Sequence, residues 1–143
     1  MSVDRETGLT LARQVVAEIG PRLNIREWHM GGSCAIAGSG RDVDIIILQD
    51  KEVELDAFTW LLDEHGFLLC GEESYDGAGM FVALRRGDVN LIIVENAEYY
   101  RSWEKAQAVS RWLHNCGFEG RPYRVFVHRL VRDGELWPYR PLN

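Results

Sequence analysis

The stretch MGGSCAIAGSGRDVDIIIL, residues 30–48, carries the most informative pattern of this chain. Asp42 and Asp44 stand at the start of an apolar run, and a Gly-Gly-Ser sequence, residues 31–33, lies a short loop upstream. Because successive side chains of a strand point to opposite faces, the two acids share one face with Ile46. Two neighbouring carboxylates repel each other, and burying either of them as an anion is costly. The pattern therefore predicts a cation beside the acid pair.

The chemistry of these residues favours a magnesium ion with a bound nucleotide. Mg²⁺ prefers carboxylate oxygens together with the phosphate oxygens of a nucleotide. Gly31 and Gly32 allow the backbone to approach a ligand closely, and the Ser33 hydroxyl can hydrogen-bond to phosphate. Arg41, directly before the acid pair, has two open roles. It contacts a nucleotide phosphate, or it pairs with Asp42 and lowers the pKa of that carboxyl.

At these residues the chain resembles the nucleotidyltransferase superfamily, whose fold is shared by DNA polymerase beta and the small antibiotic-modifying nucleotidyltransferases. The family pattern is a hydrophobic residue, Gly, and Gly or Ser, followed after a short spacer by Asp, a hydrophobic residue, Asp or Glu, and another hydrophobic residue. Residues 30–32, a spacer of nine residues, and residues 42–45 satisfy every position. In its small size the chain is similar to short nucleotidyltransferase-like proteins of bacteria and their phages.

The resemblance covers residues 28–94 and implies an activity with its site residues. The implied reaction is Mg²⁺-dependent transfer of a nucleoside monophosphate from a nucleoside triphosphate to a hydroxyl of RNA, protein or a small molecule. One or two Mg²⁺ ions would be bound by Asp42 and Asp44. The triphosphate would be bound by four residues: Gly31, Gly32, Ser33 and Arg41.

One position departs from the family pattern. Members that catalyse transfer carry a third carboxylate on a neighbouring strand, whereas the matching strand here, residues 85–94, has Asn90 at that place. An amide can offer a carbonyl oxygen to a metal but cannot act as a general base near neutral pH. Asp88, two residues earlier and so on the same strand face, either substitutes for the missing acid or caps the turn at Gly87. Loss of a general base lowers a rate by about 10²- to 10⁴-fold.

Two functions from different classes follow. In the first, the protein is an enzyme in which Asn90 or Asp88 completes the catalytic site. In the second, the same fold with weakened catalysis binds another protein and inhibits or regulates a nucleic-acid enzyme, and phage origin is open. The missing third carboxylate favours the second function, and so does the acidic first half of the chain, which could occupy a basic nucleic-acid-binding surface.

Charge is distributed unevenly along the chain. Residues 1–100 carry eight Lys or Arg against eighteen Asp or Glu, whereas residues 101–143 carry eight against four. The basic C-terminal segment suits contact with a triphosphate or a polyanionic acceptor, or it forms a solvated helix surface that pairs with the acidic half. Arg85 and Arg86, one strand away from the acid pair, either steer the triphosphate or face solvent.

The composition is that of a globular protein in a reducing compartment. Its 143 residues suffice for one domain with a single core, and no apolar run approaches the roughly 18 residues of a membrane span. Three widely separated cysteines predict reduced thiols and a cytoplasmic location, and the N-terminus lacks a signal peptide's basic and apolar regions. Cys34 is expected to be a small buried thiol.

Hydrophobic periodicity predicts a single domain over residues 1–143, of class α/β (α+β), with a small mixed β-sheet flanked by helices. Its nucleotidyltransferase-like core spans about residues 25–95, and a C-terminal helical part follows at about residues 96–133. Helices are expected at residues 4–19, 34–37, 52–65, 97–114 and 122–132. Strands are expected at residues 25–30, 42–48, 67–72, 80–85 and 88–94, with a polar turn at residues 73–79.

Overall fold

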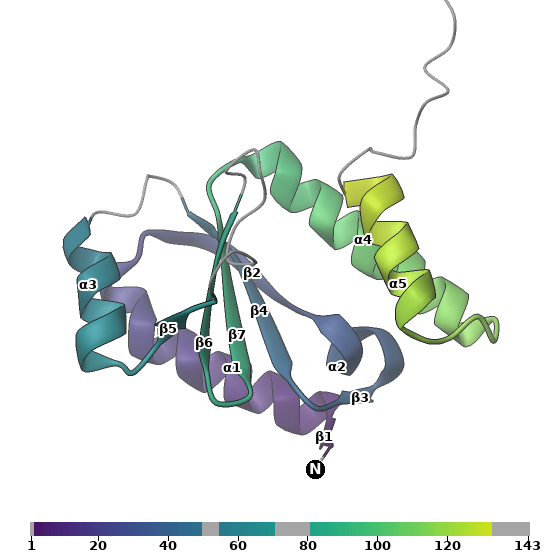
Figure 1. Ribbon diagram of the computed structural model, residues 1–143, viewed down its shortest axis with the longest axis horizontal. Coiled ribbons are helices and arrows are strands. Elements are labelled where there is room, and N and C mark those ends of the chain that lie inside the picture. Colours follow the sequence, from purple (N-terminus) through teal and green to yellow (C-terminus); the bar gives the residue numbers. More distant parts are fainter. Residues whose placement is uncertain (1, 50–54, 71–80, 133–143) are drawn as a thin grey trace, which may run out of the picture.

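The computed structural model describes residues 2–49, 55–70 and 81–132, and its elements follow the predicted order (Figure 1). The predicted turn at residues 73–79 lies outside these ranges. The helices are α1 (Arg5–Ile19), α2 (Gly32–Ala37), α3 (Leu55–Glu64), α4 (Ala97–Asn115) and α5 (Arg121–Val127), with a 3₁₀ turn at Gly20–Arg22 and a π-helical turn at His128–Arg132. The strands are β1 (Val3–Asp4), β2 (Ile25–Gly31), β3 (Ser39–Gly40), β4 (Val43–Gln49), β5 (Leu68–Leu69), β6 (Phe81–Arg86) and β7 (Val89–Val94).

Within the described residues, five strands form one mixed sheet in the order β2-β4-β7-β6-β5. The neighbours β4 and β7 run parallel, and the other neighbouring pairs are antiparallel. The predicted class, a mixed sheet flanked by helices, is confirmed. A separate antiparallel pair of β1 with β3 was not predicted. The strand predicted from residue 42 begins at Val43, so that Asp42 directly precedes β4.

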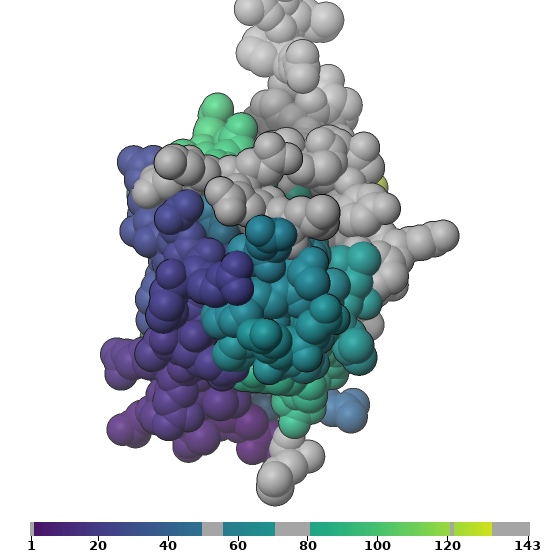
Figure 2. All heavy atoms as spheres, turned by 90° about the vertical axis from the view of Figure 1, so that its left-hand side faces the viewer, coloured from purple at the N-terminus to yellow at the C-terminus, as the bar shows by residue number. Residues whose placement is uncertain are grey.

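The two faces of the sheet have separate apolar cores. On one face, Ile45, Ile47 and Leu91 pack with buried residues of α1 and α3. Figure 2 shows α1 in purple and α3 in teal, side by side on this side of the molecule. On the other face, strand residues pack against three of the aromatic residues of α4, namely Tyr99, Tyr100 and Trp103. These aromatic residues therefore belong to the core and do not form an exposed stacking surface.

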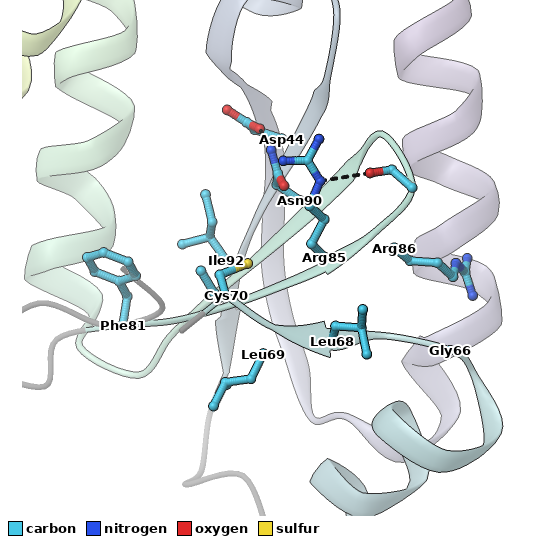
Figure 3. A pocket seen from close by; sticks show the side chains of 12 residues that line it. Asp44, Gly66, Leu68, Leu69, Cys70, Phe81, Arg85, Arg86, Asn90 and Ile92 are labelled. Atoms are coloured by element: carbon cyan, nitrogen blue, oxygen red, sulfur yellow. Dashed lines mark hydrogen bonds between the residues drawn. The ribbon is translucent and has the colours of Figure 1, made fainter. Parts of the chain in front are cut away.

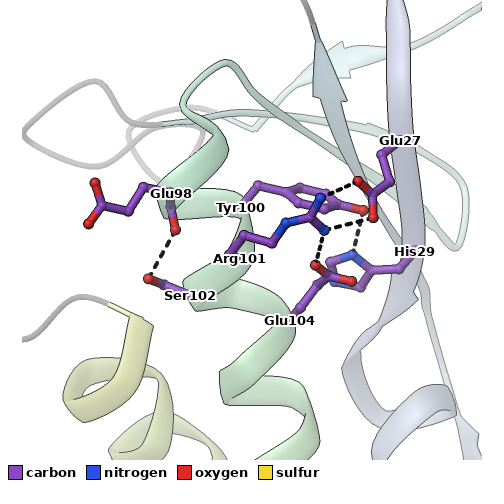
Figure 4. A network of polar contacts seen from close by, with 7 residues as sticks. All are labelled: Glu27, His29, Glu98, Tyr100, Arg101, Ser102 and Glu104. Carbon is purple, nitrogen blue, oxygen red and sulfur yellow. Dashed lines mark hydrogen bonds and ion pairs between the residues drawn. The ribbon is translucent and has the colours of Figure 1, made fainter.

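Polar contacts fix α4 against the edge strand β2 (Figure 4). The Tyr100 hydroxyl lies 2.9 Å from Nδ1 of His29, and burial raises the pKa of Tyr100 and lowers that of His29. Arg101 donates to both carboxylate oxygens of Glu27, at 2.7 and 2.6 Å. At the start of α4, the Asn96 side chain accepts a hydrogen bond from the Tyr99 amide and caps the helix. These contacts place the C-terminal helices beside the glycine turn.

None of the helices in the described part of the chain is both long and apolar enough to cross a membrane. Cys34, Cys70 and Cys116 are free thiols. Cys34 is buried as expected, and burial raises the pKa of its thiol.

Candidate functional site

The register of the sheet places four positions in one row. Gly31 on β2 is opposite Asp44 on β4, Asp44 is opposite Asn90 on β7, and Asn90 is opposite Arg85 on β6. Laterally paired residues of neighbouring strands share one face of a sheet. The side chains of Asp44, Asn90 and Arg85 therefore gather on the face that also carries the α4 contacts (Figure 3). Asn90, which stands at the place of the family's third carboxylate, thus lies beside Asp44.

Asp44 is the more buried acid of the site, and its side chain is partly buried. Its Oδ1 accepts a hydrogen bond from Nδ2 of Asn90 at 2.9 Å. Burial raises the pKa of Asp44, and the charge of Asp42 raises it further, whereas the Asn90 hydrogen bond and the charges of Arg85 and Arg124 oppose the increase. The negative charge of Asp44 is thus only partly compensated, because neither guanidinium pairs with it directly.

The glycine turn closes over this carboxylate. Gly32 has a φ of +68°, which side chains other than that of glycine rarely tolerate, and a Cβ there would lie 2.3 Å from Oδ2 of Asp44. At Gly31 a Cβ would lie 2.5 Å from the Ile46 side chain and 2.7 Å from Nε2 of Gln107. Close packing therefore requires both glycines, and Gly32 lies directly against Asp44.

Asp42 lies at the exposed margin of the site. Nη2 of Arg85 lies 3.3 Å from its Oδ1, and the two side chains are 50% and 38% exposed. Nε of Arg85 also donates to the carbonyl of Gly87 at 2.9 Å. An exposed ion pair at this distance is weak, since water screens it. A cation that binds the Asp42 carboxylate more tightly can therefore displace the guanidinium of Arg85.

Arg124 reaches the site from the far end of the chain. Its Nη1 donates to Oγ of Ser33 at 2.6 Å, which joins α5 to the first turn of α2. The motif search in the sequence missed Arg124, because it lies 91 residues from Ser33. Only the positive balance of residues 101–143 indicated that the C-terminal helices contribute a cation.

A pocket of about 720 Å³ opens beside Asp44 and Asn90, over strands β5, β6 and β7. Figure 3 shows polar side chains at one end of it and Phe81 with Ile92 toward the other. The lining residues include Asp44, Arg85, Asn90, Leu69, Cys70 and Phe81. The pocket has the size and the mixed polar and apolar lining typical of small-ligand sites.

Two further residues that the sequence assigned to the site, Arg41 and Asp88, have exposed side chains. Arg41 is exposed, and the ion pair that the structure shows for Asp42 is with Arg85. Asp88 is exposed in the turn before β7, where its backbone carbonyl accepts a hydrogen bond from the Val43 amide at 2.8 Å. In the described ranges, no three His, Cys, Asp or Glu side chains gather as a metal site. Metal binding would thus depend on two acids together with ligand oxygens.

Comparison with known proteins identifies the fold. No protein-family model matches the chain, and no curated protein matches it by sequence. The crystal structure of the conserved protein GrpB from Enterococcus faecalis is similar, with a TM-score of 0.65 and 12% sequence identity. The alignment covers 96% of this chain and 99% of GrpB. At this identity the likeness shows that the two proteins share a fold, and it shows nothing further.

Proposed function

We propose that this protein binds a nucleoside triphosphate with Mg²⁺ and transfers the nucleoside monophosphate to a hydroxyl acceptor. The observation that most directly supports this proposal is the position of Asp44. This carboxylate is partly buried, lies against the glycine turn at Gly32 and is only partly compensated by positive charge. Burying an anion in this way is unfavourable unless a ligand supplies the missing cation. The nucleotidyltransferase-like fold supports the same reaction class.

The residues present fit Mg²⁺. This ion is usually held by one or two carboxylates plus substrate phosphates and water, and Asp42 and Asp44 supply that number. Asn90 donates through its Nδ2 and keeps its carbonyl oxygen for a further contact. When bound, Mg²⁺ would neutralise phosphate charge and orient the transferred group. An Asp42 carboxylate held by an exposed ion pair is free to rearrange for this purpose.

The residues of the chain would contribute mainly binding and orientation. Gly32 leaves room for the carboxylate of Asp44 beside the ligand, and the Ser33 hydroxyl donates to a phosphate oxygen. Phosphoryl transfer depends largely on such positioning and on charge stabilisation. Asn90 cannot take the proton of the acceptor hydroxyl, so that Asp42, the more exposed carboxylate of the pair, would receive it. We therefore expect slow turnover.

A second candidate function is nucleotide-dependent regulation of a protein partner without turnover. The observation that favours it is the hydrogen bond from Asn90 to Asp44, because an amide occupies the position of a third carboxylate. In this case the protein binds Mg²⁺ and a triphosphate, and no product forms. Product analysis after incubation separates the two functions.

The test is calorimetric titration with ATP, GTP, CTP and UTP, with Mg²⁺ and with a chelator. Wild type should bind at least one of them only with Mg²⁺, and Asp42→Ala/Asp44→Ala should lose that binding. The matched control removes two exposed acids of α3, Asp56→Ala/Asp63→Ala, and should bind as wild type does. Unchanged affinity in the site variant would show that the acid pair serves another purpose. Incubation with α-labelled nucleotides and a cell lysate then detects transfer.

A further inference from the structure

Among the residues that the structure describes, one positive charge at the site has no carboxylate partner. Arg124 is partly buried, and its guanidinium donates to the neutral hydroxyl of Ser33. Across residues 2–49, 55–70 and 81–132, no Asp or Glu lies within ion-pair distance of it. A guanidinium carries five N–H donors in a fixed fork that matches the oxygens of phosphate. The arrangement therefore leaves donors and charge for an anion.

Two other arginines of this molecule show the contrasting, structural arrangement. Arg86 donates to both carboxylate oxygens of Glu18, at 2.7 and 2.9 Å. Arg101 donates to both carboxylate oxygens of Glu27 and also contacts Glu104. In each case the charge is neutralised within the fold. Arg124 differs from both, although it lies closer to the acid pair and lowers the pKa of Asp44 through its charge.

The backbone of Arg124 is held in place by the following turn. Nδ1 of His128 lies 2.8 Å from the carbonyl oxygen of Arg124. Because a carbonyl only accepts, this nitrogen carries the proton, and the other ring nitrogen faces Nε2 of Gln107 at 3.5 Å. Gln107 in turn lies against Gly31. Two C-terminal elements thus present Arg124 to the glycine turn in a defined orientation.

Ser33 adds a second donor at the same place. Its oxygen accepts the hydrogen bond from Arg124, so that its own proton remains to be donated. In the proposed reaction the transferred α-phosphate lies at the acid pair. The phosphates beyond it then extend along the glycine turn, on the side of Ser33.

We infer that Arg124 and Ser33 bind the β- and γ-phosphates of the nucleoside triphosphate, so that α5 is part of the nucleotide site. This inference rests on the proposed function, which it extends from the core of the fold to the C-terminal helices. It also assigns a role to part of the positive charge of residues 101–143. The inference predicts that Arg124 discriminates between nucleotides by the number of their phosphates.

The test measures the affinities of the best-binding triphosphate and its mono- and diphosphate, with Mg²⁺, for wild type and three variants. Arg124→Gln should weaken triphosphate binding by about 10- to 100-fold, the loss usual for one hydrogen bond between charged groups. Its effect on the monophosphate should stay within about threefold. Arg124→Lys, which keeps the charge but not the fork, should lie between these values. Arg129→Gln removes an exposed arginine from the next turn and should bind as wild type does.

The outcomes separate the two proposals. If Arg124→Gln binds the triphosphate as wild type does, or loses affinity equally for mono- and triphosphate, the inference on Arg124 is wrong and the proposed function stands. If wild type binds no nucleotide with Mg²⁺, the proposed function fails and the inference fails with it. Circular dichroism and thermal unfolding confirm that each variant is folded. Should Arg124→Gln unfold, Arg124→Lys and Ser33→Ala decide, and triphosphate affinity unchanged in both overturns the inference.

Discussion

Two adjacent arginines on β6, Arg85 and Arg86, have opposite surroundings. Arg86 donates to both oxygens of Glu18, to the carbonyl of His65 at 2.9 Å, and lies over the ring of Phe67 at 4.5 Å. Arg85 has a single contact of 3.3 Å with Asp42 and a hydrogen bond to its own turn. Successive strand residues point to opposite faces, which places one arginine among α1 and α3 and the other at the candidate site.

The difference separates an arginine that is paired within the fold from one that lies at the candidate site. The donors of Arg86 are used within the fold, and they depress the pKa of Glu18 to about 2. Arg85 is half exposed, and its partner is an acid that a metal ion would also bind. The sequence offered two roles, triphosphate steering or exposure to solvent, for both residues together. In the structure the two residues differ: Arg86 pairs with Glu18 within the fold, and Arg85 lies beside Asp42.

The largest effect is expected for Arg86→Ala. Removing this side chain breaks the contacts with Glu18 and His65 and exposes the ring of Phe67, so that the free energy of unfolding should fall by about 2 kcal/mol. That corresponds to a lowering of Tm by about 5 to 10 °C. Thermal and urea unfolding measure both quantities. The matched variant Arg85→Ala should change the stability by no more than about 0.5 kcal/mol. Equal losses of stability in both variants would show that Arg85 and Arg86 contribute alike to the fold.

A smaller effect is expected for Asn90→Asp at the site. The new carboxylate cannot donate to Asp44 as the amide of Asn90 does, and it adds a third negative charge beside Asp42 and Asp44. Without metal, the free energy of unfolding should fall by about 1 to 2 kcal/mol. Mg²⁺ should restore it, and nucleotide transfer should rise if the protein is an enzyme limited by the missing acid. Wild-type stability without any Mg²⁺ response would contradict the site geometry.

The order of the elements could be predicted because hydrophobic periodicity and turn residues are local signals. The helix ending at Ile19 and the hairpin of β6 with β7 are examples. The pairing of β1 with β3 was missed, since two-residue strands carry no periodic signal. At the site, the motif of glycines and acids indicated that the glycine turn faces the acid pair, and the structure adds that Gly32 lies against Asp44. The partner of Asp42 was not predictable, because either Arg41 or Arg85 could reach it. Arg124 was missed because helix packing, which brings it to Ser33, leaves no motif.

Acidification should affect the two regions with opposite signs. The folded-state pKa of Glu18 is about 2, against an ordinary value of 4.5. Its stabilising contribution is therefore present above about pH 4.5 and is lost as the pH falls from there toward 2. Since about a third of the side chain is exposed, we expect a contribution on the order of 1 kcal/mol. For Asp44 the folded pKa is raised, so that protonation on acidification relieves a buried charge and increases stability.

Urea unfolding between pH 7 and pH 3 tests these signs with two isosteric variants. In Glu18→Gln the free energy of unfolding should fall less on acidification than in wild type, because the carboxyl whose protonation costs stability is absent. In Asp44→Asn it should fall more, because the carboxyl whose protonation adds stability is absent. A pH dependence identical to that of wild type in both variants would show that neither carboxyl has a perturbed pKa.

The smallest effect is expected for Arg85→Gln. The direction of its change in Mg²⁺ affinity is the most specific test of the difference between Arg85 and Arg86. The ion pair between Arg85 and Asp42 competes with any metal ion for the same carboxylate. Exposed pairs contribute about 0.2 to 1 kcal/mol, so that removing the guanidinium should tighten Mg²⁺ binding in the absence of nucleotide by about two- to fivefold. Calorimetric titration with Mg²⁺ measures the change. Arg41→Gln is the matched control, because Arg41 directly precedes Asp42, is exposed, and forms no ion pair with Asp42 in the described part of the chain. If Arg41→Gln gains affinity for Mg²⁺ and Arg85→Gln does not, the charge that competes with Mg²⁺ is that of Arg41. Arg85 would then be an exposed surface residue.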